Sequence, residues 1–246
     1  MNINVEYSHA FQPIIDIEDR RIISYEVLLR GKNDEPPGVI FEQISKENFM
    51  AFDQASRERA ITLAANLGLK CSLNLNFTPG SILYEGGKYV ESTVASAITQ
   101  GLEANQLIFE ITESEVVNTS DELVNVINKL RRKGITIAID DFGAGHAGLN
   151  LLADLQPDLI KLDMHLLRGI DKNGARQSIV KAILSVCLDL GIDVLAEGVE
   201  TKEEFQFLKK QGIVLYQGYL FAKPGFECLP SVSSEYIGGE KALTMP

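Results

Sequence analysis

Short runs of apolar and β-branched residues alternate with longer amphipathic segments along most of the chain. Eight short runs have the length and composition of buried strands. They cover residues 11–17, 22–30, 71–76, 107–112, 136–140, 159–162, 193–197 and 214–217. Strands that alternate with helices form mostly parallel sheets. Eight such units in 246 residues therefore predict an α/β fold, a closed (β/α)8 barrel, with an open doubly wound sheet as the alternative.

Four of the amphipathic segments have clear helical spacing of their apolar residues. They cover residues 49–67, 120–133, 175–190 and 202–210. Glycine follows three of them, at Gly68, Gly134 and Gly191, as is common after a helix. Residues 31–38 and 78–88 are expected to be loops. No linker divides the chain, so we expect a single barrel domain over residues 1–230 and a flexible C-terminal tail over residues 231–246.

Polar residues stand at or near the ends of the predicted strands, where a buried strand should avoid them. They are Glu26, Asn74, Glu110, Asp140, Asp141, Lys161, Glu197 and Gln217. The carboxyl ends of parallel barrel strands meet at one mouth, where barrel enzymes have their active sites. Side chains up to about 190 positions apart are therefore expected to meet in one pocket.

The charges of this set predict a metal centre. Five carboxylates and one ammonium group leave an excess of four negative charges, which two divalent cations would neutralise. Oxygen ligands favour Mg²⁺ or Mn²⁺ over Zn²⁺, and His9, His146 and His165 form no zinc-binding pattern. Paired cations of this kind promote phosphoester hydrolysis, with a metal-bound hydroxide as the nucleophile.

Two neighbouring aspartates in this set, Asp140 and Asp141, would point to opposite faces of a regular strand. Both can reach one site only where the strand ends and the backbone turns. The following Phe-Gly-Ala-Gly sequence, residues 142–145, is expected to supply that turn because glycine permits positive φ.

Overall composition excludes several other classes of protein. A formal net charge of −11 disfavours a general binder of DNA or RNA. The longest apolar runs are too short to span a membrane, and the first ten residues do not resemble a signal peptide. Three widely separated cysteines, Cys71, Cys187 and Cys228, argue against a disulfide framework, so a cytoplasmic location is expected.

At these residues the sequence resembles the EAL domain of bacterial cyclic di-GMP phosphodiesterases. The resemblance extends from Phe11 to Pro224 and is carried by motifs in the family's order. They are FQPI at 11–14, YEVLLR at 25–30, LNL at 73–75, EITES at 110–114, DDFG at 140–143, IKLD at 160–163, AEGVE at 196–200 and QGY at 217–219. The resemblance implies a modified TIM barrel with an antiparallel first strand. It also implies a homodimer that hydrolyses cyclic di-GMP to linear pGpG.

The resemblance also implies roles for individual residues. The metal ligands would be Glu26, Asn74, Glu110 and Asp140, with Asp141 serving the second metal and Glu197 in the same cluster. Lys161 would orient the nucleophilic water and stabilise developing charge, and Gln217 would position a metal-bound water; these two and Glu197 form the expected catalytic set. Gln12 and Arg30 would bind substrate. Glu113 would anchor the loop that follows Asp141.

Two positions depart from the common form of the family. Val27 replaces the alanine of the name-giving motif, and the loop at 143–148 lacks the usual threonine, tyrosine and serine. The alternatives to an enzyme are an inactive cyclic di-GMP receptor and a protein-interaction module. Because every ligand position that can be mapped is filled, the enzyme is the favoured interpretation. A sensor or regulatory domain outside this sequence remains a further possibility.

Overall fold

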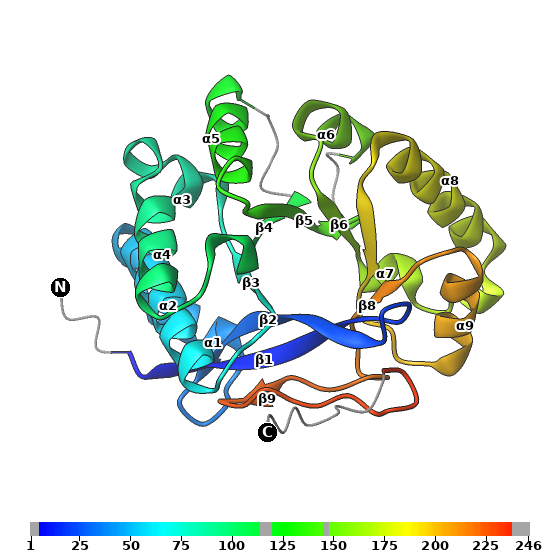
Figure 1. Cartoon of the computed structure of the whole chain (residues 1–246), viewed down its shortest axis with the longest axis horizontal. Coiled ribbons are helices and arrows are strands. Elements are labelled where there is room, and N and C mark those ends of the chain that lie inside the picture. The colour runs from blue at the N-terminus through cyan, green and yellow to red at the C-terminus, as the bar shows by residue number, and fades with distance from the viewer. Residues whose placement is uncertain (1–4, 114–119, 145–147, 238–246) are drawn as a thin grey trace, which may run out of the picture.

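The computed structural model describes residues 5–113, 120–144 and 148–237, and its strands close into a barrel surrounded by helices (Figure 1). The strands are β1 Tyr7–Asp16, β2 Arg21–Gly31, β3 Ser72–Asn76, β4 Leu107–Thr112, β5 Thr136–Phe142, β6 Leu159–Leu162, β7 Asp193–Ala196, β8 Leu215–Tyr216 and β9 Gly225–Phe226. They pair in the order β2-β3-β4-β5-β6-β7-β8-β1-β9, and β1 also pairs with β2. The predicted barrel is confirmed, and the short β9 is an addition to it.

The first strand runs against its neighbours, as the family resemblance implies. β1 forms an antiparallel hairpin with β2, from Tyr7 opposite Gly31 to Asp16 opposite Arg21. It also pairs antiparallel with β8 through Ile15 and Asp16. All pairs from β2–β3 to β7–β8 are parallel. The reversed strand therefore closes the barrel between β8 and β2.

Helices pack around the outside of the barrel (Figure 1). They are α1 Pro37–Phe41, α2 Lys46–Asn66, α3 Pro79–Leu83, α4 Lys88–Thr99, α5 Asp121–Arg131, α6 Gly148–Leu155, α7 Met164–Leu167, α8 Gly174–Leu190 and α9 Lys202–Lys210. The four predicted helices correspond to α2, α5, α8 and α9. Among the described residues, no helix is long and apolar enough to cross a membrane.

Two segments expected to be loops contain helix. α3 lies inside residues 78–88, and α1 begins at Pro37 within residues 31–38. The start of α3 carries a recognisable signal, because the Thr78 hydroxyl accepts a hydrogen bond from the backbone N–H of Ser81 and proline follows at the first helical position. Short helices that begin with proline resemble loops when only composition is considered.

The inside of the barrel is built in layers. Apolar residues from six strands form a buried cluster there: Ile14, Ile108, Ala138, Leu159, Leu195 and Leu215. Side chains two positions apart on a strand share a face. On the parallel strands, the residue two positions further toward the carboxyl end also points inward, and it lies at the barrel mouth. On the reversed β1, the equivalent residue lies two positions before Ile14. This geometry prepares a second layer, which is polar.

The barrel's packing extends into the segment expected to be a flexible tail. Val232 and Ile237 are buried in the main core, and the Tyr236 ring packs edge-on against the rings of Phe205 and Phe221. Side chains as far along the chain as Ile237 therefore pack against the barrel core. Residues 238–246 of the expected tail lie outside the described residues.

Candidate metal centre

Eight polar side chains form the layer above the apolar cluster, six from strands β1 to β6 and two from the residues directly after β7 and β8. They are Gln12, Glu26, Asn74, Glu110, Asp140, Lys161, Glu197 and Gln217, and all are buried except the half-buried Glu197. Seven of the eight were expected from the sequence to meet in one pocket. The structure brings them together from strands that span most of the chain.

The carboxylates form two groups that could each hold a metal ion. One group is Glu26, Glu110 and Asp140, and the other is Asp140, Asp141 and Glu197; within each group, one oxygen of every residue lies within 4.8 Å of those of the others. Because Asp140 belongs to both groups, a shared ligand would connect two neighbouring cation positions. This arrangement suits a pair of divalent cations.

Lys161 occupies the centre of this cluster and is fully buried. Its Nζ lies 2.9 Å from Asp140 Oδ1 and 3.2 Å from Glu110 Oε1. Glu26 Oε2 and Glu197 Oε2 follow at 3.4 and 3.5 Å. One ammonium group therefore balances part of the charge of four carboxylates.

Several buried oxygen atoms in the layer have no hydrogen-bond partner. They are Asn74 Oδ1, Glu110 Oε2, Glu197 Oε2 and Gln217 Oε1. The other side of the Asn74 amide is engaged, because Nδ2 donates to Glu110 Oε1 at 2.8 Å. Buried polar atoms without partners are costly, and unpaired oxygens beside carboxylates are the ligands that Mg²⁺ and Mn²⁺ prefer. These residues therefore fit an oxygen-ligated cation.

Burial, and after it the neighbouring carboxylates, raise the pKa values of acidic groups in the cluster. Burial, together with the nearby Glu26 and Asp140, raises the pKa of Glu110 to about 8. Burial and the adjacent Asp140 raise the pKa of Asp141 to about 6. Burial alone would favour a neutral Lys161, but the surrounding carboxylates raise its pKa well above the usual value. Both carboxyl shifts favour the neutral form, and a bound divalent cation would oppose them by favouring the ionised form.

The turn that brings Asp140 and Asp141 together begins earlier than expected. β5 continues to Phe142, and its pairing with β6 is irregular between Ile139 and Phe142. Asp141 itself adopts a left-handed conformation with φ 55°, which costs a residue other than glycine about 1–2 kcal/mol. Non-glycine residues in such conformations cluster at functional sites. The bulge is followed directly by a turn, in which the N–H of Ala144 donates to the carbonyl of Asp141 at 3.1 Å and Gly143 has φ 95°. The bulge and the expected turn therefore lie together where the two carboxylates meet.

Glu113 is buried next to this bulge, and its Oε2 accepts a hydrogen bond from the backbone N–H of Gly143 at 2.9 Å. Glu113 therefore contacts the segment directly after Asp141, and its role as an anchor of that loop stays a prediction. Residues 145–147 of the altered loop, including His146, lie outside the described residues.

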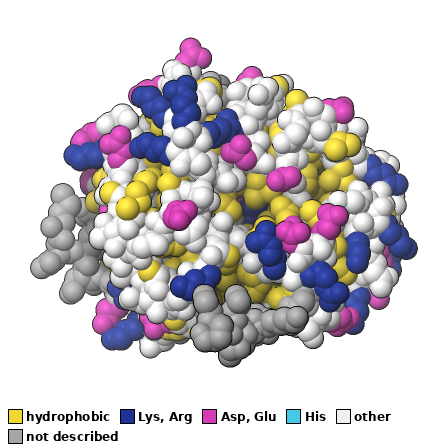
Figure 2. All heavy atoms as spheres, viewed as in Figure 1, with side chains coloured by type: hydrophobic (Ala, Val, Ile, Leu, Met, Phe, Trp, Pro, Cys, Tyr) yellow, Lys and Arg dark blue, Asp and Glu magenta, His cyan; other side chains and the backbone are white. Residues whose placement is uncertain are grey.

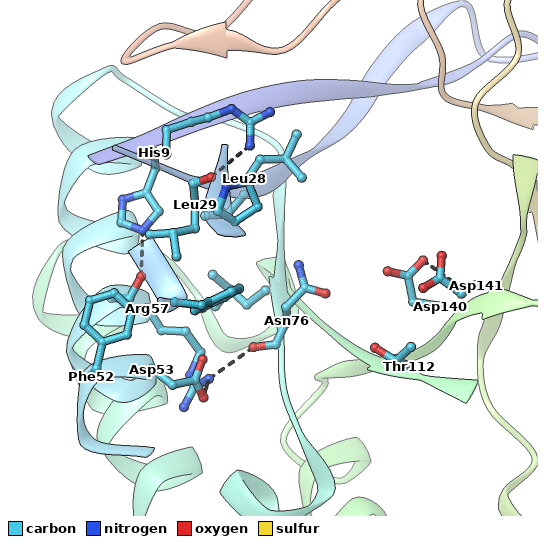
Figure 3. A pocket seen from close by; sticks show the side chains of 16 residues that line it. His9, Leu28, Leu29, Phe52, Asp53, Arg57, Asn76, Thr112, Asp140 and Asp141 are labelled. Carbon is cyan, nitrogen blue, oxygen red and sulfur yellow. Dashed lines mark hydrogen bonds and ion pairs between the residues drawn. The ribbon is translucent and has the colours of Figure 1, made fainter. Parts of the chain in front are cut away.

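A cavity of about 470 Å³ opens beside the acidic cluster (Figure 3). Asp140 and Asp141 lie at one side of it, and Arg30, on β2, is also among the lining residues. The Arg30 guanidinium donates to the carbonyl of Leu29 at 2.8 Å and lies 3.4 Å from Asp34. Figure 2 shows that the face of the molecule viewed in Figure 1 is hollowed near its middle.

Two side chains in this region have contacts that the sequence did not reveal. His9 lines the cavity, is buried, and contacts the Ser56 hydroxyl through Nε2 at 2.9 Å. Gln12, expected to bind substrate, uses both ends of its amide within the protein, on Ala222 and Gln217. All three contacts join segments far apart in sequence, so local patterns give no signal for them.

Comparison with known proteins gives a consistent result. A family model described as the EAL domain matches residues 3–224. The blue light- and temperature-regulated antirepressor BluF of Escherichia coli K12 is 38% identical over 225 residues, which are 91% of this chain and 56% of BluF. Cyclic di-GMP phosphodiesterase PA2567 of Pseudomonas aeruginosa is 30% identical over 87% of this chain and 38% of that protein. The chain thus spans about half the length of the curated relatives or less.

Solved structures agree with the fold. A standalone versatile EAL protein from Vibrio cholerae O395, in its c-di-GMP-bound form, is 42% identical with a TM-score of 0.89, over 95% of this chain and 98% of that chain. Klebsiella pneumoniae BlrP1 in a complex with manganese and cyclic di-GMP is 40% identical with a TM-score of 0.85, over 90% of this chain and 56% of that one.

Proposed function

The chain belongs to the EAL domain family, and on this basis we propose that it is a metal-dependent phosphodiesterase that hydrolyses cyclic di-GMP to linear pGpG. The observation that carries the proposal is the pair of carboxylate groups that share Asp140, beside buried oxygens without partners. Relatives support it, since one is a cyclic di-GMP phosphodiesterase by name and BlrP1 binds manganese with cyclic di-GMP.

We assign the ligands from the geometry of the two groups. Glu26, Asn74, Glu110 and Asp140 would hold one Mg²⁺ or Mn²⁺, and Asp140, Asp141 and Glu197 the other. When bound, two such cations neutralise the cluster and make a coordinated water more acidic. Lys161, 2.9 Å from Asp140, would stabilise negative charge on the phosphate as the bond breaks. The unpaired Oε1 of Gln217 would orient the attacking water by accepting one of its hydrogens.

The cavity beside Asp140 and Asp141 would hold the nucleotide. Arg30 lines it, and a guanidinium binds phosphate oxygens well because its N–H groups form a planar fork. The present partners of Arg30 are a backbone carbonyl and an exposed aspartate.

A second candidate function is a protein-interaction module. BluF, at 38% identity, is an antirepressor by name. Such a role needs no metal ligands, whereas this chain has an acidic or amide side chain at every expected ligand position. An inactive cyclic di-GMP receptor is likewise less favoured than an enzyme, for the same reason.

We further propose that the protein acts as a homodimer through the exposed side chains of α6 and α8. Leu149 on α6 and Ile179 on α8 are 58% and 51% exposed. They line an apolar hollow of about 310 Å³ that reaches Phe142, Gly143 and Glu113. A second copy that covers this hollow would touch the segment directly after Asp141. A sensor or regulatory domain could act through the same surface.

The proposal is tested by incubating the purified protein with cyclic di-GMP and Mn²⁺ or Mg²⁺ and following pGpG by chromatography. Glu26→Gln removes one ligand charge with little change of shape. Turnover should fall by more than about 100-fold, because even the loss of residues that support metal ligands costs 10–100-fold. The matched control is Glu42→Gln, which alters an exposed glutamate outside the site.

Each outcome distinguishes the candidates. Product that forms with metal and disappears with EDTA supports the enzyme. Saturable nucleotide binding without product indicates the receptor. Neither binding nor product indicates the interaction module, and full activity of the Glu26→Gln protein contradicts the ligand assignment.

A further inference from the structure

A chain of hydrogen bonds connects a backbone carbonyl to the candidate metal ligand Glu26. Gln12 Nε2 donates to the carbonyl oxygen of Ala222 at 3.1 Å. Gln217 Nε2 donates to Gln12 Oε1 at 3.2 Å and to Glu26 Oε2 at 2.6 Å. The three side chains are all buried, so water does not compete readily for these contacts.

The chain has a fixed direction because both of its ends only accept hydrogen bonds. The Ala222 carbonyl accepts, so the Gln12 amide must present its NH₂ to Ala222 and its oxygen to Gln217. The carboxylate of Glu26 also accepts, so the NH₂ of Gln217 must face both Glu26 and the oxygen of Gln12. If either amide were reversed, two oxygens or two NH₂ groups would face each other.

The consequence concerns the remaining oxygen. Once the NH₂ of Gln217 is shared between Gln12 and Glu26, its Oε1 is the only free polar atom of that amide, and it is buried without a partner. A buried acceptor without a partner is destabilising by itself. It becomes useful when it meets a donor such as a coordinated water, or a cation.

We propose that Gln12 is a positioning residue that sets the orientation of the Gln217 amide, so that Gln217 holds Glu26 with its NH₂ and presents Oε1 to the metal centre. This inference rests on the proposed function. It differs from the substrate-binding role expected for Gln12, because both polar atoms of Gln12 are engaged within the protein.

The proposal predicts how the two glutamines depend on each other. Gln12→Met keeps the length of the side chain but removes both polar atoms, so the Gln217 amide loses the contact to Gln12 and is held only by its hydrogen bond to Glu26. We expect affinity for Mn²⁺, measured by calorimetry without nucleotide, to fall by about 10-fold, the lower end of the range for residues that support metal ligands. If Gln12 acts only through Gln217, the double variant with Gln217→Met binds Mn²⁺ no more weakly than Gln217→Met alone.

Thermal unfolding in EDTA shows whether each variant folds. If Gln12→Met does not, Gln12→Ala is used, because it leaves room for a water to serve the Ala222 carbonyl. Unchanged Mn²⁺ affinity with a raised KM for cyclic di-GMP, or additive losses in the double variant, would overturn the inference alone. A wild-type protein that binds no Mn²⁺ would overturn the proposed function and this inference with it.

Discussion

Lys161 shows how a single residue makes an acidic barrel mouth tolerable. It is fully buried and lies within 3.5 Å of four carboxylates. Burying one charge costs desolvation energy, but the attraction of the surrounding carboxylates offsets that cost for a buried ammonium group. The same side chain therefore serves two purposes: it is placed to act on the substrate, and it stabilises the metal-free protein.

Replacing this residue separates the two purposes. Lys161→Met leaves the carboxylates without a counter-charge, and breaking a buried ion pair costs about 3–5 kcal/mol. We expect that loss of unfolding free energy in urea with EDTA present, and we expect Mn²⁺ to restore more stability to the variant than to the wild type. Lys181→Met, on the exposed face of α8, is the control. An equal response of the variant and the wild type to Mn²⁺ would show that Lys161 does not substitute for metal charge.

At the scale of the element, the short β8 depends on the loop that follows it. Gln217 stands at the end of this strand, and its backbone is held between Ala196 and Val199 by hydrogen bonds of 2.9 and 3.1 Å. The next residue, Gly218, has φ 154° and lies so close to the backbone of Val199 that a Cβ there would overlap it at less than 3.0 Å. Only glycine allows this approach.

A Gly218→Ala substitution therefore tests whether the end of β8 positions the site. The added methyl group must displace the Val199 backbone, and such overpacking costs about 1–3 kcal/mol. We expect unfolding free energy to fall by about 3 kcal/mol, with a weaker affinity for Mn²⁺ because Gln217 shifts. Gly174→Ala, at the open first residue of α8, should change stability by less than about 0.5 kcal/mol. A stable Gly218→Ala protein with normal Mn²⁺ affinity would show that the loop after β8 does not position the site.

These elements also show what sequence could and could not predict. Polar residues at the ends of apolar strands can be recognised from a few neighbouring residues. Glu110 and Lys161 could therefore be expected at one mouth of the barrel. Helix α4 was missed, although Val90, Val94 and Ala97 have helical spacing. The bulge at Asp141 depends on pairing with β6. The contact of Gln12 with Gln217 joins residues 205 positions apart, which only the closed barrel brings together.

At the scale of the whole molecule, the proposed dimer makes a testable claim about α8. Ile179→Lys places a charge in an apolar contact that would be buried between two copies, so we expect the dissociation constant of the dimer to rise by at least about 10-fold, or about 1.4 kcal/mol. Sedimentation velocity measures it, with Ile98→Lys as the control at a similarly exposed isoleucine on α4. Equal effects of the two substitutions would place the interface elsewhere.

The antiparallel closure also has a consequence for how the chain reaches its fold. β1 pairs with β8 through two residue pairs, whose members lie about 200 positions apart. Contacts of such separation form slowly, because the loop entropy is lost before the contacts are gained. During synthesis at about 5–20 residues per second, the β1–β2 hairpin would wait for roughly 10 to 40 seconds with the outer edge of β1 unpaired. Unpaired edges attract other strands, so a nascent chain of this kind is most prone to aggregate before β8 emerges.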